Sequence, residues 1–247
     1  MRVAAAQIRS APGDVPANTE KHRTAVGQAA ARGADMIVFP ELSLTGYEPA
    51  LAGELAFEAD DSRLAIFQKD SAATGITIGI GVPTQSDDKP RISLVFFAPG
   101  TSPVTYAKRY LHDDEVPFFQ AGEEQVVLPV EKELLVPAIC YEARLPEHMA
   151  HACELGATVY LASVAKPADG TDRAHAYFPK AARQHSVAVV MANAVGPSDS
   201  FVSAGRSAAW SRNGECLVSA NDTDECLLLV DTAAAEATIE PIALASS

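Results

Sequence analysis

The stretch DMIVFPE, residues 35–41, decides the first element of the fold, because four consecutive apolar residues lead directly to a proline and a glutamate. A short apolar run of this kind is typical of a buried strand. The stretch LLVPAIC, residues 134–140, has the same form and ends at a cysteine. The stretch VTYAK, residues 104–108, predicts a third strand that ends at a lysine. Each of these strands therefore leads to a residue that can do chemistry.

Helical and strand patterns alternate along the rest of the chain, which argues for an α/β layered fold with helices on both sides of its β structure. The turn signal SRNG, residues 211–214, predicts a late antiparallel hairpin. No seam divides the chain, so we expect one domain over residues 1–247. Its tail, from about residue 232, is expected to be extended and to lie at a dimer interface. The remaining predicted helices are 18–32, 54–73, 146–155 and 172–185, and the remaining strands are 3–8, 77–82, 92–98, 158–164 and 187–192.

Charge and apolar patterning exclude several classes of function. The net charge of −13 disfavours binding to a nucleic-acid backbone. No apolar run approaches the roughly 20 residues that span a bilayer, and the N-terminus lacks the pattern of a signal peptide. We therefore expect a cytoplasmic protein without membrane contact, whose four cysteines, none in a CxxC pair, are free thiols.

The residues at the three strand ends, Glu41, Lys108 and Cys140, can act together in one reaction. In α/β sheets, ligands bind outside the carboxyl ends of the strands, so Glu41, Lys108 and Cys140 are expected at one crevice. Glu41 can take the thiol proton, and Lys108 can stabilise the thiolate and the oxyanion that forms on attack. The backbone N–H of Tyr141, at the start of a helix expected directly after Cys140, would add to this oxyanion site. Glu41 could then protonate the departing amine and activate water.

Longer motifs surround these residues. FPELSLTGY, residues 39–47, resembles the glutamate motif of the nitrilase superfamily, and ICYEARLPE, residues 139–147, resembles its cysteine motif. KRYL, residues 108–111, is similar to the lysine motif, with Glu115 in the place of the downstream glutamate. The resemblance covers essentially the whole chain in the family's order, so the chain is identified as a member of this superfamily of carbon–nitrogen hydrolases, in an amidase-like branch.

The resemblance implies a four-layer α-β-β-α sandwich in a single domain. It implies a catalytic triad of Glu41, Lys108 and Cys140, with Glu115 positioning Lys108 or the substrate's amide. It further implies no metal or organic cofactor, and a homodimer or higher homo-oligomer that takes a small-molecule substrate.

The pocket wall is where the chain departs from the family pattern. Residues 161–166, LASVAK, lack the aromatic or Asn-Trp pair that many members place there. Val164 and Lys166 could shape the pocket instead. Lys166 could meet a substrate carboxylate, although a solvated lysine is the expectation. Tyr47 has two open interpretations, pocket lining and simple packing, and we name Tyr47, Tyr141 and Val164 as the candidate substrate-binding residues.

Other polar residues are expected to be structural. Glu142 and Arg144 should brace the turn around Cys140. His148 and His151 lie three apart on a predicted helix but do not form a recognisable zinc motif, so no metal site is predicted. The other cysteines, Cys153, Cys216 and Cys226, are expected to be packed thiols.

The predicted function is hydrolysis of a small amide through a Cys140 thioester, with release of ammonia or an amine. Hydrolysis of nitriles or of N-carbamoyl compounds by the same triad remains an alternative. So does acyl transfer to an amine, and so does a glutamine-amide domain that serves a synthetase on a separate chain. An interpretation from a different class is a non-catalytic ligand-binding homologue.

Overall fold

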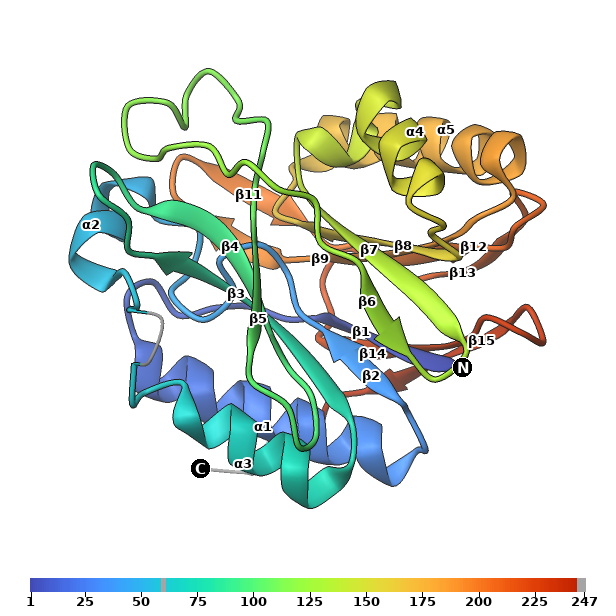
Figure 1. Ribbon diagram of the computed structural model, residues 1–247, viewed down its shortest axis with the longest axis horizontal. Coiled ribbons are helices and arrows are strands. Elements are labelled where there is room, and N and C mark those ends of the chain that lie inside the picture. The colour runs from blue at the N-terminus through green and yellow to red at the C-terminus, as the bar shows by residue number, and fades with distance from the viewer. Residues whose placement is uncertain (59–60, 244–247) are drawn as a thin grey trace.

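Two β-sheets lie face to face in the computed structural model, which describes residues 1–58 and 61–243. Helices cover the outer face of each sheet, so the molecule has four layers (Figure 1). This arrangement confirms the predicted α-β-β-α sandwich.

The first sheet contains seven strands in the order β15-β14-β1-β2-β3-β4-β5. Its central strands β1, β2 and β3 are parallel, and the outer strands pair antiparallel. The strands are β1 (Arg2–Gln7), β2 (Met36–Val38), β3 (Thr77–Thr84), β4 (Arg91–Phe97), β5 (Val104–Ala107), β14 (Cys226–Asp231) and β15 (Glu236–Pro241).

The second sheet contains six strands in the order β13-β12-β9-β8-β7-β6, with β7, β8 and β9 parallel. The predicted hairpin is confirmed, because β12 and β13 pair antiparallel around residues 211–214. A separate two-stranded sheet is formed by β10 and β11. The strands are β6 (Leu128–Val130), β7 (Glu133–Ile139), β8 (Val159–Val164), β9 (Ala188–Asn193), β10 (Val195–Ser198), β11 (Phe201–Ala204), β12 (Ala208–Trp210) and β13 (Cys216–Ser219).

The helices divide between the two outer layers. α1 (Val15–Ala31) and α3 (Ala65–Thr74) cover the first sheet, whereas α4 (Pro146–Glu154) and α5 (Ala168–His185) cover the second (Figure 1). Three short elements complete the structure: α2 (Ala52–Leu55) and the 3-10 turns η1 (Pro49–Leu51) and η2 (Glu142–Arg144).

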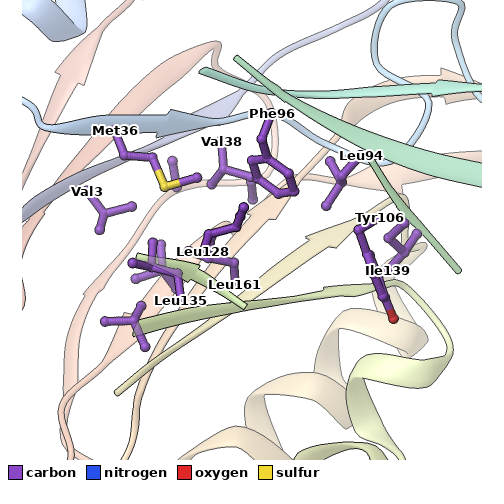
Figure 2. Close-up of a cluster of buried hydrophobic side chains, with 14 of the residues drawn as sticks. Val3, Met36, Val38, Leu94, Phe96, Tyr106, Leu128, Leu135, Ile139 and Leu161 are labelled. Atoms are coloured by element: carbon purple, nitrogen blue, oxygen red, sulfur yellow. The ribbon is translucent and has the colours of Figure 1, made fainter. Parts of the chain in front are cut away.

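Alternation along the strands creates a separate core for each interface between layers. Successive strand residues point to opposite faces of a sheet. In β7, Leu135 and Ile139 therefore face the other sheet, whereas Val136 and Ala138 face the helices. Figure 2 shows the core between the sheets, where Met36, Phe96 and Leu161 meet. Burial of this apolar surface, at about 25 cal/mol per Å², is what holds the two sheets together.

The helix predicted over residues 54–73 is wrong. The structure has two helices here, α2 and α3, with non-helical chain after Leu55; residues 59 and 60 lie outside the described part. Phe57 forms a bridge with Thr84 at the end of β3, where its N–H donates to Pro83 O at 2.9 Å. This long-range pairing takes the backbone away from the helix.

α1 begins at Val15, three residues before the predicted start. Asp14 caps this helix, because its Oδ1 accepts a hydrogen bond from Ala17 N, and the Asn18 amide bonds to backbone atoms of Ala11 and Leu44. In the C-terminal tail, β15 forms an edge strand on β14. Residues 244–247 lie outside the described residues, and the dimer contact expected there stays a prediction.

Candidate active site

Strand ends from both sheets meet in one place. Glu41 follows β2 and Lys108 follows β5 in the first sheet, and Cys140 follows β7 in the second. Ser163 Oγ, on β8, donates to Phe39 O at 2.8 Å and so ties the second sheet to the end of β2. The structure therefore brings the three predicted catalytic residues together at the edge where the two sheets face each other.

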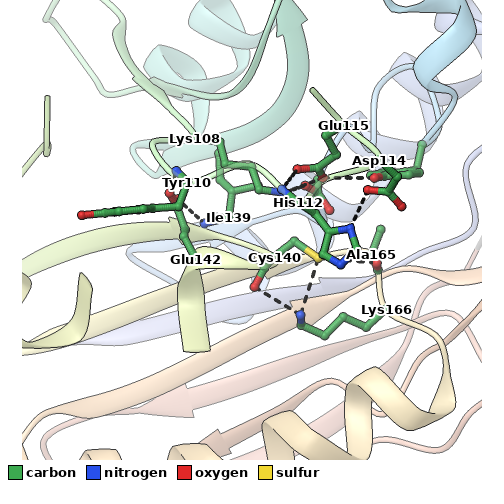
Figure 3. A network of polar contacts seen from close by, with 12 residues as sticks. Lys108, Tyr110, His112, Asp114, Glu115, Ile139, Cys140, Glu142, Ala165 and Lys166 are labelled. Carbon is green, nitrogen blue, oxygen red and sulfur yellow. Dashed lines mark hydrogen bonds and ion pairs between the residues drawn. The ribbon is translucent and has the colours of Figure 1, made fainter. Parts of the chain in front are cut away.

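Lys108 is held between two carboxylates. Its Nζ donates to Glu41 Oε1 at 2.8 Å and to Glu115 Oε1 at 2.6 Å, and all three side chains are buried. Figure 3 shows Lys108 and Glu115 in this contact. Burial opposes the charge of Lys108, but the Coulombic attraction of both carboxylates raises its pKa well above the ordinary value. Lys108 is thus a fixed, buried cation between the two glutamates.

Glu41 and Glu115 differ in how their oxygens are used. Glu115 is fully engaged, because Oε1 also accepts from Tyr47 OH at 3.0 Å and Oε2 accepts from His112 N at 2.8 Å. Glu41 Oε2, by contrast, is buried and accepts no hydrogen bond from any described residue. Burial, opposed by Lys108, raises the pKa of Glu41. A carboxylate with a free oxygen and a raised pKa is suited to accept a proton.

Two glycines let the backbone approach closely enough to place these residues. A Cβ on Gly81 would lie 2.3 Å from Pro40 O, beside Glu41. A Cβ on Gly122 would lie 2.4 Å from Ala107 O, and Gly122 N donates to Lys108 O at 2.7 Å. Any larger side chain at either position would push the catalytic segment out of place.

Cys140 lies at a strained turn that a buried carboxylate braces. Its φ is +47°, a left-handed conformation that is uncommon for residues other than glycine. Glu142 accepts from Ile139 N at 2.8 Å and from Arg109 N at 2.7 Å, and so links the cysteine turn to the segment after Lys108. The bracing role predicted for Glu142 is confirmed. Arg144, in contrast, forms no ion pair within the described chain.

The helix expected directly after Cys140 is not there. The three-residue turn η2 follows, and α4 begins only at Pro146. A helix macrodipole acts mainly within its first turn, so it contributes little at Cys140. The N–H of Tyr141 nevertheless donates to no acceptor among the described residues, and it remains available to an oxyanion.

His148 belongs to the support of this turn and not to a metal centre. Its Nε2 lies 2.9 Å from Tyr106 OH, its Nδ1 lies 2.7 Å from Tyr160 OH, and the side chain is buried. Tyr106 OH also donates to Glu142 Oε1 at 2.7 Å. Within the described ranges, no group of three or more His, Cys, Asp or Glu residues is placed to hold a metal ion.

The Cys140 sulfur is partly exposed and has two polar neighbours from the end of β8. Its Sγ donates to Ala165 O at 3.6 Å, and Lys166 Nζ lies 3.5 Å from Sγ and 3.2 Å from Cys140 O (Figure 3). Burial and the charge of Glu41 raise the pKa of the thiol, and the charges of Lys166 and Lys108 partly offset this increase. Cys140 therefore rests as a neutral thiol, and it must lose its proton before its sulfur can act as a thiolate.

Lys166 is the residue that sequence reasoning underestimated. The expectation of a solvated lysine is wrong, since the side chain is buried and directly contacts the nucleophile. A usable signal was present: Lys166 follows β8, the parallel neighbour of β7, and the carboxyl ends of parallel strands share one edge.

A pocket of about 280 Å³ opens above Cys140. Tyr47 and Tyr141, two of the expected substrate-binding residues, lie in its wall. Val164 does not: it is fully buried among the side chains between the second sheet and its helices, because it points to the opposite face of β8. The pocket is lined by Tyr47, His112, Asp114, Glu115, Cys140, Tyr141, Arg144, Ala165, Lys166, Pro167, Asp169, Gly170, Arg173 and Phe201.

A larger, more open hollow of about 640 Å³ lies next to this pocket and shares Tyr141 with it. Neither Cys140 nor any other catalytic candidate lines this hollow. Of these two pockets, the smaller one is lined by Cys140 and Glu115. Along the described chain, no helix is both long and apolar enough to cross a membrane.

Comparisons with known proteins agree with this geometry. Residues 2–238 match the family model of the carbon-nitrogen hydrolases. The NitN amidase from Nesterenkonia sp. AN1 is 25% identical, with a TM-score of 0.86 over 94% of this chain and 92% of that chain. A cysteine-to-alanine mutant of that amidase, also 25% identical, has been solved in complex with butyramide.

Curated relatives add a second group. The glutamine-dependent NAD(+) synthetase of Thermotoga maritima is 29% identical over 94% of this chain, but the chain spans only 42% of its length. A hydrolase from Pseudomonas protegens is 29% identical over 93% of this chain and 81% of its own. The site, the fold and the family match lead to one conclusion: this chain belongs to the carbon-nitrogen hydrolase family, within the nitrilase superfamily, and is a hydrolase.

Proposed function

We propose that this enzyme hydrolyses the carbon–nitrogen bond of a small amide, with Cys140 as nucleophile, Glu41 as general base and acid, and Lys108 as the cation that stabilises the oxyanion. The observation that carries the proposal is the buried Glu41–Lys108–Glu115 cluster, whose member Glu115 lines the same pocket as Cys140. A pocket of about 280 Å³ suits a small substrate. It also agrees with the butyramide bound by the related amidase.

The first half of the reaction forms a thioester. Glu41 takes the thiol proton, Sγ attacks the carbonyl carbon, and the carbonyl oxygen gains the negative charge. Lys108 and the N–H of Tyr141 stabilise that charge. When the tetrahedral intermediate collapses, the C–N bond breaks and the proton on Glu41 passes to the leaving nitrogen.

The second half hydrolyses the thioester. Glu41, again ionised, takes a proton from water, whose oxygen attacks the thioester carbon. The second tetrahedral intermediate expels the sulfur, which recovers its proton from Glu41. The products are the carboxylic acid and the free enzyme. Glu115 takes no proton in this scheme: its hydrogen bonds to Lys108, Tyr47 and the His112 N–H keep Lys108 in position.

The deciding experiment is a screen for ammonia release from aliphatic amides, ω-amides of dicarboxylates, N-carbamoyl amino acids and nitriles. Wild type and Cys140→Ala are assayed together, with Cys216→Ala as the matched control because Cys216 is exposed and lies outside the pocket. We expect the best amide to lose at least about a thousandfold in rate with Cys140→Ala, and to be unaffected in the control. Turnover at the parental rate by Cys140→Ala would disprove the proposal.

A second candidate is hydrolysis of the side-chain amide of glutamine. The similarity to glutamine-dependent synthetases favours it, as does Arg144, which lines the pocket and has no carboxylate partner within the described chain. A glutamine arm in the same screen separates the candidates. A kcat/KM for glutamine well above that for aliphatic amides would select it, and no release of ammonia from glutamine would reject it.

A further inference from the structure

Lys166 presents an unusual combination of burial and partners. Its side chain is 4% exposed, yet no carboxylate of the described residues lies within ion-pair distance of it. Its side-chain contacts are both to the nucleophilic residue, at 3.5 Å from Cys140 Sγ and 3.2 Å from Cys140 O (Figure 3). A buried cation is costly unless an anion compensates it. The anion that can form at this position is the Cys140 thiolate.

The charges of the reaction centre support this assignment. With both carboxylates ionised, Glu41, Lys108 and Glu115 carry one net negative charge, and Lys166 brings the sum to zero. Transfer of the Cys140 proton to Glu41 leaves this sum unchanged but moves the negative charge onto sulfur. The charge thus leaves the oxygen next to Lys108 and arrives at the sulfur next to Lys166.

We propose that Lys166 is a further catalytic residue, whose ammonium group stabilises the Cys140 thiolate when the thiol proton passes to Glu41. The inference rests on the proposed function, in which Cys140 is the nucleophile. In the step itself the S–H bond breaks, an O–H bond forms on Glu41, and the electron pair stays on sulfur. Lys166 gives up no proton.

The charged groups around Cys140 act in both directions. Glu41 and Glu115 raise the pKa of the thiol, as does burial, and Lys166 and Lys108 lower it. Lys108 pairs with two carboxylates, whereas Lys166 pairs with none among residues 1–58 and 61–243. Four charged residues from other elements also line the pocket. Asp114 contacts His112, and Asp169 pairs with Arg173 at 2.7 Å. The fourth is Arg144.

A purely structural role for Lys166 makes a different prediction. The hydrogen bond from Nζ to Cys140 O could simply hold the turn at its positive φ. In that case, an uncharged donor would serve as well as an ammonium group. Lys166→Gln keeps a hydrogen-bond donor and removes the charge, whereas Lys166→Arg keeps the charge and changes the shape.

The test follows the rate of Cys140 alkylation by iodoacetamide as a function of pH, read by mass spectrometry of the Cys140 peptide. Exposed Cys216 in the same sample is the internal reference. In Lys166→Gln we expect the midpoint for Cys140 to rise by about one pH unit or more, because an opposite charge at this distance lowers a pKa by about 1–3 units. Below both midpoints, Cys140 alkylation should be about tenfold slower. Lys166→Arg should stay within about half a unit of wild type.

Two results would overturn the proposal. One is an unchanged midpoint in Lys166→Gln, which assigns Lys166 a structural role whatever happens to turnover. The other is an equal shift in Lys166→Arg. If Lys166→Gln does not fold, Lys166→Arg decides alone: a wild-type midpoint and turnover within about tenfold support the proposal, and loss of both contradicts it. Alkylation needs no amide, so a failed substrate screen would count against the proposed function and leave this test intact.

Discussion

Lys108 and Lys166 are two buried lysines at one nucleophile, and they differ in their partners. Lys108, from the first sheet, contacts two carboxylates at 2.8 and 2.6 Å. The ammonium group of Lys166, at the end of β8 in the second sheet, hydrogen-bonds to Cys140 and, in the described chain, to no carboxylate. A cation that pairs with two carboxylates, as Lys108 does, is fixed in place and stabilises the fold. An uncompensated cation responds to the anion that the reaction creates. The following predictions test that difference, from the largest expected effect to the smallest.

Replacing Lys108 should destabilise the fold more than any other change at the site. Lys108→Met leaves Glu41 and Glu115 buried without a cation, and breaking a buried ion pair in this way costs about 3–5 kcal/mol. The free energy of unfolding in urea measures this directly. A loss below about 1 kcal/mol would show that Lys108 is not the structural cation described here. Ammonia release should fall as well, since the oxyanion loses its counter-charge.

The two sheets should share a sensitivity to acid, because each half of the site is supported by a buried neutral histidine. Behind Glu41, His22 bonds to Asn18 O and Ser43 Oγ; behind Cys140, His148 bonds to two tyrosines. Burial lowers the pKa of His22 to about 4 and that of His148 to about 3.

The sign of the acid effect follows from these values. Below pH 6.5 the histidines take up protons in the unfolded chain but stay neutral in the folded chain. Their full contribution to the free energy of unfolding is therefore present above pH 6.5, and it decreases as the pH falls toward 4. For His22 alone, the loss between pH 7.5 and pH 5 should be about 2 kcal/mol. Urea unfolding across this range measures it. His22→Gln should start less stable and show a flatter profile; a profile as steep as that of wild type would contradict the assignment.

Tyr47 supports Lys108 indirectly, through Glu115. Its hydroxyl donates to Glu115, which in turn holds Lys108. Tyr47→Phe removes one hydrogen bond to a charged group, worth about 1.5 kcal/mol. We expect a roughly tenfold lower kcat. Phe201 lines the same pocket and packs edge-on against Tyr47, so Phe201→Leu is a control that alters this packing but keeps the Tyr47 hydroxyl. A change in KM alone would instead indicate that Tyr47 only contacts substrate.

The smallest effect on stability is expected for Lys166. Because this cation has no carboxylate partner in the described chain, Lys166→Gln should change the free energy of unfolding by less than about 1 kcal/mol while it reduces turnover. The contrast with Lys108→Met in the same urea assay is the sharpest test of the comparison. A loss of 3 kcal/mol or more would place both lysines in the same structural class.

Much of the site could be predicted because its signals are local. Glu41, Lys108 and Cys140 each follow an apolar run, and the motifs around them resemble one family. The structure brings these residues and Glu115 together. What failed depends on distant partners: residues 54–73 have a helical pattern, but Phe57 pairs with the end of β3 instead. Val164 was assigned to the pocket although it points to the opposite face of its strand.

The sequence by itself determined the layered architecture, the strand ends that hold Glu41, Lys108 and Cys140, and the chemistry that these groups share. These features follow from strand alternation and side-chain type, which a linear sequence carries. Only the tertiary structure decided which lysine is compensated and which is not, and that Lys166 is buried at the nucleophile. The physical reason is that burial and ion pairing are properties of neighbours in space. Ala165 and Lys166, which contact the Cys140 sulfur, directly follow β8 and so come from another part of the chain.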